Sequence, residues 1–545
     1  MRGWILIVPF ATSCAAPPAS MDAALRTDAV ADAASDPCEP FGRFGAPLET
    51  FTLPGPDGVG AMYIPDVQAR FPAVRWSTLD RLYVPAGTYA LINLGNLPVR
   101  TAEHPLVITN HGGQVVLRPP AGSHYGYLWV LNGGAHWVAT GRFDPVSGTG
   151  DAAFPGHRCG AYANSRGTYG FLSDDAFLNA GHMGLAIGDA RFVEAEFIEI
   201  TRAGFAGLRV LSSVQADGTR PTLDGYDLHD LYIHDTKSEG VYFGWTGAPP
   251  SPLSSGLRVH HNRFVRTGAE ALQVQNLGDG TEIHHNAVAF AALDWRAAFQ
   301  NYQDNNAQVQ VRSGAIRVHH NAFVGAAANL LLLFSGPEGS DGPRTVTFED
   351  NHFADTLSLG AYLGGTSGPG SSYAFRRNAF RGLDFGYDSL VPTAPNYGVV
   401  FRAAATFTSP VTVVDGEWEG AAHLAAGLAS GDGAAGIFTA TGNRNGAVVP
   451  FAFADTGLPD GTPTRRLELW TDRATLAPGM PAMTYAPGAL VMYDAELYRC
   501  RVANSGQVPP TSPASWEHLP LPVDDLRTAP GTVWAARDVG LPATR

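Results

Sequence analysis

Apolar and polar positions alternate in one short pattern that recurs five times in the middle of the chain. Each copy has an apolar residue, two polar residues, an asparagine, a variable residue and a second apolar residue. The copies occupy residues 259–264, 283–288, 318–323, 348–353 and 375–380. Alternate side chains of a strand point to opposite faces, so each copy predicts two short strands joined at the asparagine. Repeats at intervals of 24 to 35 residues indicate a solenoid or a propeller.

One asparagine stands at the same point of every repeat. No helical periodicity separates the copies, so each repeat predicts a coil of parallel strands. An asparagine at a fixed turn can adopt a left-handed conformation, and its amide can bond backbone groups and the asparagine of the adjacent coil. The sequence therefore predicts a ladder of asparagines, with loops of variable length elsewhere.

These asparagine turns and the strands after them resemble the right-handed parallel β-helix proteins of the pectin-lyase-like superfamily. The resemblance covers about residues 80–450. It implies an all-β fold, a right-handed parallel β-helix solenoid, which we expect over residues 41–470. The superfamily includes polysaccharide lyases, glycosidases, epimerases, phage tailspikes and adhesins, so the resemblance leaves the reaction open.

A second module is predicted at residues 478–520. A Gly-x-x-Val-x-Tyr strand, a Leu-Tyr-x-Cys strand and a terminal Trp-Glu resemble the small chitin-binding-type carbohydrate-binding modules of secreted hydrolases. The resemblance implies a three-stranded β module in which Tyr485, Tyr498 and Trp516 stack on sugar rings. The alternative is that these aromatic side chains form the core of the small fold. Residues 521–545 form a C-terminal segment that can return to the β-helix.

The N-terminus, residues 1–13, resembles a bacterial lipoprotein signal peptide, with a positive start, a short apolar stretch and small residues before Cys14. It predicts lipidation of Cys14 and a membrane anchor in the cell envelope, as an outer-membrane lipoprotein. The alternative is an ordinary secretory signal and a secreted protein. Residues 14–40 are rich in Ala, Pro, Ser and Asp and predict a flexible tether. No later apolar run is long enough to span a bilayer.

The three remaining cysteines, Cys38, Cys159 and Cys500, match no metal-ligand spacing. In an exported protein a disulfide between Cys38 and Cys159 is one interpretation, and buried free thiols are the other. The formal net charge of −14 argues against nucleic acid as a partner and gives no general attraction for an anionic polymer. With 63 glycines, 40 prolines and 45% hydrophobic residues, the composition fits many turns around one long core. We expect a monomer.

Strand alternation also predicts an outward row of side chains along the coils. The apolar pairs 208/210, 241/243, 272/274 and 309/311 should point inward. The outward stack is then Arg209, Tyr242, Gln273 and Gln310, with Gln275 and Arg312 one step further along. Adjacent coils lie about 4.8 Å apart, so such a stack spans several sugar units. Trp245 and Trp295 are further predicted sugar platforms.

Two carboxylates, Glu239 and Glu270, fall one above the other in the same register. Such a pair can separate its pKa values for acid and base catalysis, or hold a cation such as calcium. The alternative is that both are exposed charges that oppose edge pairing. A polysaccharide lyase needs a base and a cation that stabilises an enolate, and Lys237, His234, Arg209 and Arg312 can supply these groups.

Two further patterns are weaker. The histidine pairs 260/261, 284/285 and 319/320 look like metal ligands, but they recur with the asparagine turn, so we expect solvated or stacked turn residues and no metal site. Asp174-Asp175 and Gly181-His182 partly match polygalacturonase-type glycosidases, but Met183 stands where those enzymes have glycine. We therefore do not assign that activity.

Three functions remain open, and the third, a purely structural envelope protein, is disfavoured by the predicted sugar-binding module. The first is a carbohydrate-active enzyme, a lyase or a hydrolase, that acts on an extracellular polysaccharide and uses the small module as an anchor. The second is a surface lipoprotein that binds glycans without catalysis, for adhesion or capture.

Overall fold

The computed structural model describes most of the chain between residues 47 and 541. The described residues are 47–141, 169–245, 252–294, 303–335, 342–365, 368–383, 399–419, 436–448, 451, 453, 458, 467–471, 483–520, 524, 526, 528–529, 531–536 and 539–541. Cys14, Cys38 and Cys159 lie outside them, so the lipidation and disulfide interpretations stay predictions. Cys500 is a buried free thiol.

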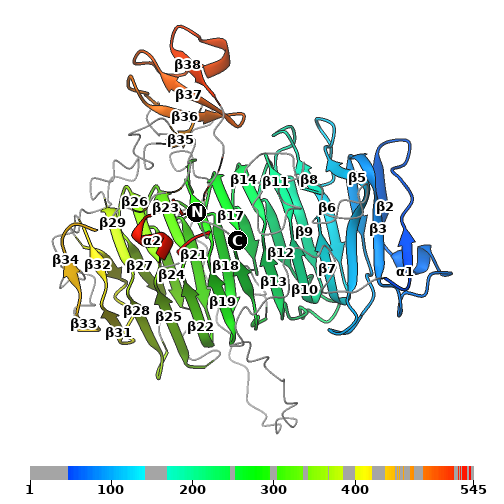
Figure 1. Cartoon of the computed structure of the whole chain (residues 1–545), viewed down its shortest axis with the longest axis horizontal. Helices are drawn as coiled ribbons and strands as arrows, with labels where there is room; N and C mark the ends of the chain where they lie inside the picture. The colour runs from blue at the N-terminus through cyan, green and yellow to red at the C-terminus, as the bar shows by residue number, and fades with distance from the viewer. Residues whose placement is uncertain are drawn as a thin grey trace.

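The described strands wind into a right-handed parallel β-helix, as the asparagine repeats predicted (Figure 1). A typical coil has three strands: β13 (Tyr226–His229), β14 (Tyr232–Thr236) and β15 (Val241–Phe243). Each strand pairs in parallel with its counterparts in the coils before and after it, as β13 does with β10 and β16. One face of the coil belongs to an 11-stranded sheet and the others to a 23-stranded sheet.

The 11-stranded sheet takes one strand from each coil. Its strands are β2 (Ala61–Ile64), β4 (Leu91–Leu94), β6 (Tyr127–Asn132), β9 (Met183–Gly188), β12 (Leu208–Leu211), β15, β18 (Leu272–Leu277), β21 (Ala307–Val311), β24 (Leu331–Ser335), β27 (Ala361–Gly365) and β30 (Phe401–Ala403).

The 23-stranded sheet contains the strands on either side of the asparagine turns. They are β1 (Thr50–Thr52), β3 (Arg81–Tyr89), β5 (Leu106–Leu117), β7 (Ala135–Thr140), β8 (Phe171–Asp174), β10 (Arg191–Glu196), β11 (Ile198–Thr201), β13, β14, β16 (Arg258–His260), β17 (Arg263–Thr267), β19 (Thr281–His284), β20 (Ala287–Ala289), β22 (Gly314–His319), β23 (Ala322–Ala326), β25 (Arg344–Glu349), β26 (His352–Thr356), β28 (Ser372–Arg376), β29 (Ala379–Leu383), β31 (Val411–Val414), β32 (Glu417–Trp418), β33 (Phe438–Thr441) and β34 (Arg444–Asn445).

Helix is confined to short segments in the described part of the chain. They are α1 (Val67–Arg70), α2 (Val533–Ala536) and the 3-10 turn Pro509–Thr511. No described helix is long and apolar enough to cross a membrane.

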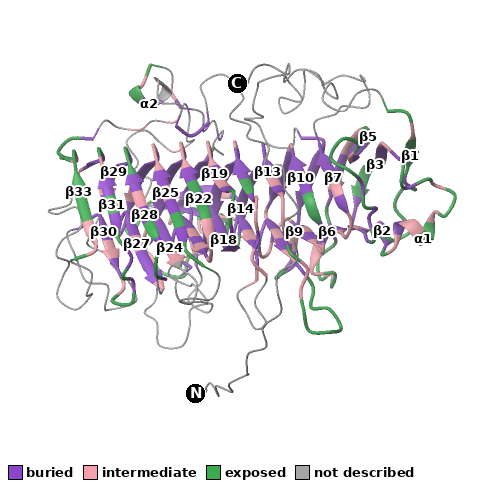
Figure 2. Cartoon of the chain, turned by 90° about the horizontal axis from the view of Figure 1, so that it is seen from below, coloured by how far each residue is buried: buried purple, intermediate pink, exposed green. Residues whose placement is uncertain are grey.

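The core is a stack of inward side chains that runs the length of the coil. Figure 2 shows the buried positions in purple along the strands. The predicted inward residues are buried, and Leu208, Val241 and Leu272 have no exposed surface. Aromatic rings in the core also stack from coil to coil, with ring centroids 5.2 Å apart for Phe323 and Phe353.

The asparagine ladder forms as predicted. The Nδ2 group of Asn286 donates to Asn321 Oδ1 at 2.9 Å and to the Val259 carbonyl at 2.9 Å. Asn321 repeats these contacts with Asn351 and with the Ile283 carbonyl. One detail of the prediction is wrong: the left-handed residue is not the asparagine but the residue before it, such as His285, whose φ is 52°.

The paired histidines form two columns of stacked rings beside this ladder. Ring centroids are 4.7 Å apart for His260 and His284 and 4.9 Å apart for His261 and His285. Within a coil, the Nδ1 atoms of the pair face each other, 2.9 Å apart for His319 and His320. Burial lowers the pKa of His319 to about 3, so this imidazole is neutral at pH 7. The expectation of stacked turn residues is confirmed.

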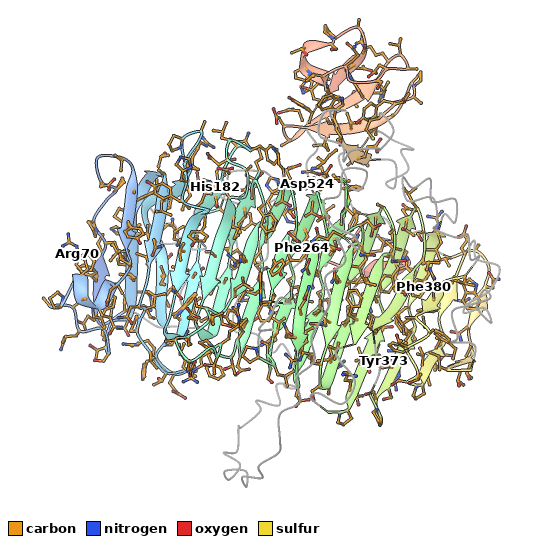
Figure 3. The ribbon with its side chains drawn as sticks, turned by 180° about the vertical axis from the view of Figure 1, so that it is seen from behind. Arg70, His182, Phe264, Tyr373, Phe380 and Asp524 are labelled. Atoms are coloured by element: carbon orange, nitrogen blue, oxygen red, sulfur yellow. The ribbon has the colours of Figure 1, made fainter. Side chains whose placement is uncertain are left out.

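The C-terminal segment binds back onto the coil. Asp524 is buried, and its Oδ1 accepts a 2.6 Å hydrogen bond from Arg266 Nη1 (Figure 3). Arg266 also donates to Asp235 Oδ1 at 2.7 Å. Further along, Trp534 is fully buried against His352. The C-terminal segment therefore gives Arg266 a second carboxylate partner beside Asp235 and packs an aromatic ring on His352.

The small module forms a separate sheet beside the coil (Figure 1). Its strands are β35 (Leu467–Leu469), β36 (Leu490–Tyr493), β37 (Glu496–Cys500) and β38 (Trp516–Leu519). The three expected strands are antiparallel, and β35, which precedes the predicted module, joins β36 in parallel. The Leu469 N–H donates to the Leu293 carbonyl at 2.9 Å, which ties the module to the coil.

We predict that Asn321→Ala destabilises the protein by about 3 kcal/mol, because it leaves buried partners of the amide without hydrogen bonds, each costing ~1–3 kcal/mol. Asn321 is fully buried. Urea unfolding followed by tryptophan fluorescence measures the change. Asn445 is exposed, so Asn445→Ala is the control and should shift the midpoint of urea unfolding little. Equal shifts for the two variants would contradict a stabilising ladder.

Candidate glycan-binding face

The outward face of the 11-stranded sheet carries the predicted row of side chains. Strand pairing places Arg209 opposite Tyr242, and Tyr242 opposite Gln273. The next position belongs to Gln308, not to the predicted Gln310. The prediction shifted β21 by two residues, which leaves every side chain on its own face, so the apolar pattern could not detect the error.

A cavity of about 370 Å³ opens at one end of this row. Its lining includes Tyr127, Arg209, Arg220 and Trp245, together with the small residues Ala186, Gly188, Ser212 and Ser213. The Arg220 guanidinium lies 5.6 Å from the ring centroid of Trp245. The cavity thus combines two cations with an aromatic ring, groups that suit an anionic sugar.

Both arginines are held by their surroundings. Arg209 Nη1 lies 3.6 Å from Met183 Sδ, and Arg220 donates to the Ser212 carbonyl. Burial lowers the pKa of the Arg209 guanidinium, but an arginine remains a cation at neutral pH. Two fixed positive charges therefore face the cavity, although the chain as a whole is acidic.

The two glutamates stack as predicted but are not exposed. Glu239 and Glu270 both have no exposed surface. Glu239 accepts hydrogen bonds from Ser238 Oγ at 2.6 Å and Gln303 Nε2 at 2.9 Å. Burial raises the pKa of both carboxyls, and the neighbouring Glu239 adds to the effect on Glu270.

This burial corrects both interpretations of the pair. The glutamates are not exposed charges, and with no exposed surface neither can touch a polysaccharide as an acid or a base. Calcium takes six to eight oxygen ligands. Within the described residues, Glu270 Oε2 is the oxygen of this pair that has no hydrogen-bond partner, so the pair does not fit a calcium site.

The groups proposed for a lyase do not meet. His234 is fully buried on β14, where its Nδ1 lies 2.6 Å from Asp235 and its Nε2 lies 3.2 Å from Glu199. Lys237 is exposed before β15, with its Nζ 5.2 Å from the ring centroid of Phe177. Arg312 follows β21 and donates to Asn276 Oδ1 at 3.1 Å. Lys237 and Arg312 therefore lie toward opposite ends of the parallel strands.

The other predicted binding residues differ in how far they are exposed. Gln275 is almost fully buried, Gln310 is half-buried and accepts from the Asn276 N–H at 3.2 Å, and Trp295 lies outside the described residues. The three aromatic residues of the module, Tyr485, Tyr498 and Trp516, are 1%, 8% and 2% exposed. They form the module's core, so they cannot present their faces to a sugar, and the alternative interpretation of them is correct.

Sequence analysis missed Tyr127 and Arg220. Tyr127 begins β6, where it pairs with Met183 in the adjacent strand. Arg220 lies in the loop between β12 and β13, and its distance from Trp245 depends on the path of that loop. No periodic pattern covers a loop residue, so the sequence held no signal for Arg220.

Comparison with known proteins supports no family assignment. A scan against protein-family models and a search of curated proteins gave no match. Among solved structures, the chain is similar to full-length tailspike protein 2 of Escherichia coli O157:H7 bacteriophage CAB120, with a TM-score of 0.31 and 10% identity over 81% of this chain and 46% of the tailspike.

Two enzymes are similar at the same level. Pectate lyase Pel9A has a TM-score of 0.29 and 10% identity over 78% of this chain and 85% of its own. The catalytic unit of a GH87 α-1,3-glucanase from Streptomyces thermodiastaticus has a TM-score of 0.26 and 11% identity over 72% and 69%. The chain spans about half the length of the tailspike proteins it matches. Similarity this low carries no argument about a substrate.

We predict that Glu270→Gln is more stable than the wild type at pH 7 and equally stable near pH 4. In the folded protein the pKa of Glu270 is raised, so this carboxyl keeps its proton, whereas in the unfolded chain it releases the proton above about pH 4.3. The stability of the wild type therefore falls as the pH rises from about 4.3 to the folded-state pKa. Glutamine does not titrate, so the variant does not lose stability in this way. Denaturant unfolding at several pH values measures the free energy of unfolding of both proteins.

The control for this prediction is Glu103→Gln. Glu103 is exposed, and hydrogen bonds to its own backbone N–H and to Thr101 lower its pKa. Its replacement should give no gain at pH 7. A Glu270→Gln variant that is less stable than the wild type at pH 7 would contradict a net cost of burying this carboxyl.

Proposed function

We propose that this protein binds a linear acidic polysaccharide along the outward face of the 11-stranded sheet. The observation that carries the proposal is the cavity lined by Arg209, Arg220 and Trp245 at one end of the outward row. Arginine forks bind carboxylates, and the indole ring offers an apolar face to the C–H groups of a sugar. A chain of uronic acid units presents both chemical groups.

The row beyond the cavity can hold further units of the polymer. Tyr242 and Gln308, which are partly exposed, follow Arg209 in the row, with the buried Gln273 between them. Further along the same row, Arg402 lies 5.4 Å from the ring centroid of Tyr362. Since the coils lie about 4.8 Å apart, the row runs along the helix axis and suits an extended chain.

Binding is better supported than cleavage. The described residues that line the cavity include no carboxylate and no histidine. Most glycoside hydrolases use a pair of carboxyl groups that flank the bond they cleave. The buried pair Glu239 and Glu270 cannot serve in this way, so we favour a glycan-binding protein over a hydrolase.

We also propose that the protein is exported and anchored by lipid at Cys14. The lipoprotein-like signal supports this proposal. An anchor followed by a tether would hold the binding face at the cell envelope, where an extracellular polysaccharide is accessible. Cys14→Ser should release the protein from the membrane fraction in a bacterial host, whereas Cys38→Ser should not. Retention of the Cys14→Ser variant would contradict the anchor.

We predict that Arg209→Ala and Trp245→Ala each weaken binding to polygalacturonate or alginate by about 10-fold, because each removes a charge-assisted or aromatic contact worth ~1–2 kcal/mol. Affinity for neutral xylan should be weaker in the wild type, and acidic binding should fall with salt. Isothermal titration calorimetry measures the affinities.

The matched control is Arg317→Ala, which removes an exposed arginine on the other sheet and should leave affinity unchanged. The same samples are assayed for new reducing ends and for unsaturated sugars by ultraviolet absorbance. Cleavage by the wild type would contradict our preference for a binding protein, and cleavage that survives Glu270→Gln would show that the enzyme uses other groups. Equal affinity for neutral and acidic glycans would contradict the role of the arginines.

A further inference from the structure

Five side chains gather at one end of the histidine columns, away from the glycan-binding face. Glu194 and Glu196 come from β10, Asp227 and His229 from β13, and His260 from β16. His229 Nε2 lies 2.9 Å from Glu194 Oε1 and 3.8 Å from Glu196 Oε2. His260 Nε2 lies 2.8 Å from Asp227 Oδ1.

Strand register produces this cluster. Glu194 pairs with Asp227, and Glu196 pairs with His229, which in turn pairs with His260. The ligand atoms of Glu194, Glu196 and His229 all lie within 4.8 Å of one another, as do those of Asp227, His229 and His260. His229 belongs to both groups, so it is the centre of the cluster.

Hydrogen bonds on the far side of each imidazole orient the two rings. His229 Nδ1 lies 2.8 Å from Asp230 Oδ2, and a carboxylate oxygen can only accept, so Nδ1 carries the proton of this bond. His260 Nδ1 lies 2.9 Å from His261 Nδ1. A carboxylate behind a histidine fixes the tautomer that leaves Nε2 free to bind a metal. Both Nε2 atoms face the carboxylates of the cluster.

We propose that this cluster binds one divalent transition-metal ion such as Zn²⁺, with His229 as the central ligand. Glu194 and Glu196 on one side and Asp227 and His260 on the other supply the remaining ligands, as two sets of three that share His229. A mixed set of imidazoles and carboxylates suits zinc, whereas calcium and magnesium prefer oxygen alone. Ligand atoms of a tetrahedral zinc site lie about 3.3 Å apart. The separations of three pairs in the cluster, 2.8, 2.9 and 3.8 Å, lie on either side of this value.

Binding would be coupled to the fold. The ion replaces the proton between His229 Nε2 and Glu194 Oε1 and releases it to solvent. Its ligands come from three successive coils, which are far apart in the unfolded chain. Zinc should therefore stabilise the folded state and raise the unfolding temperature. The cluster lies in the 23-stranded sheet, so this site is independent of the proposed glycan-binding face.

The test is a zinc titration of the full chain from which any polyhistidine tag has been removed, in competition with a chromophoric chelator. We expect one equivalent of Zn²⁺ to bind. Asp227→Asn and Glu196→Gln should each weaken binding at least 10-fold, and Asp230→Asn should weaken it by about 10-fold through the orientation of His229. Cobalt substitution should give the visible absorption of a site with nitrogen and oxygen ligands.

His284→Asn is the matched control, because His284 stands in the same column but outside the carboxylate cluster. It should leave zinc affinity unchanged. If His284→Asn weakens zinc binding as much as Asp227→Asn, the ion lies between imidazole pairs and the proposal is wrong. A wild-type protein that binds no zinc would also overturn the proposal. Thermal unfolding without zinc verifies that each variant folds. If Asp227→Asn does not fold, Glu194→Gln replaces it in the titration, because the Glu194 side chain is 16% exposed.

Discussion

The hydrogen-bonded stacking of parallel strands determines the shape of this protein, and the asparagine ladder fixes that stacking at one point of each of the five coils that carry the repeat. Each amide bonds both to the next asparagine and to a backbone carbonyl of a neighbouring coil, as Asn286 and Asn321 do. A shift of one residue would turn the apolar side chains outward and break these buried contacts together. The turns therefore stay aligned while the loops opposite them vary in length.

This alignment places like residues above one another, with consequences that depend on their chemistry. Phenylalanines gain from it, as the stack of Phe353 on Phe380 at 4.8 Å shows. The stacked ring of His319 is a neutral imidazole, because burial lowers its pKa. Carboxyls resist it, and the raised pKa of Glu270, set by burial and by the charge of Glu239, is the result. The same rows bring imidazoles and carboxylates together around His229.

The proposed binding face and the proposed metal site use this geometry in different ways. The binding face needs a row that repeats at the spacing of the coils, together with a loop that carries Arg220 to Trp245. The metal cluster needs two rows on three successive coils and no loop residue. The first can change its specificity through loop sequence, whereas the second is fixed by strand register.

The sequence by itself determined the coil, the asparagine ladder, the inward rows and the stacked histidines, because these follow from short patterns repeated at every turn. Only the tertiary structure decided which residues face solvent and which distant segments meet. The register of Gln308, the burial of Glu239 and Glu270 and the packing of Trp516 into its module core are of this kind. So is the contact of Asp524 with Arg266, 258 residues away along the chain. A local pattern specifies the face of a strand, but burial and long-range contacts depend on loops and on a returning segment that no repeat encodes.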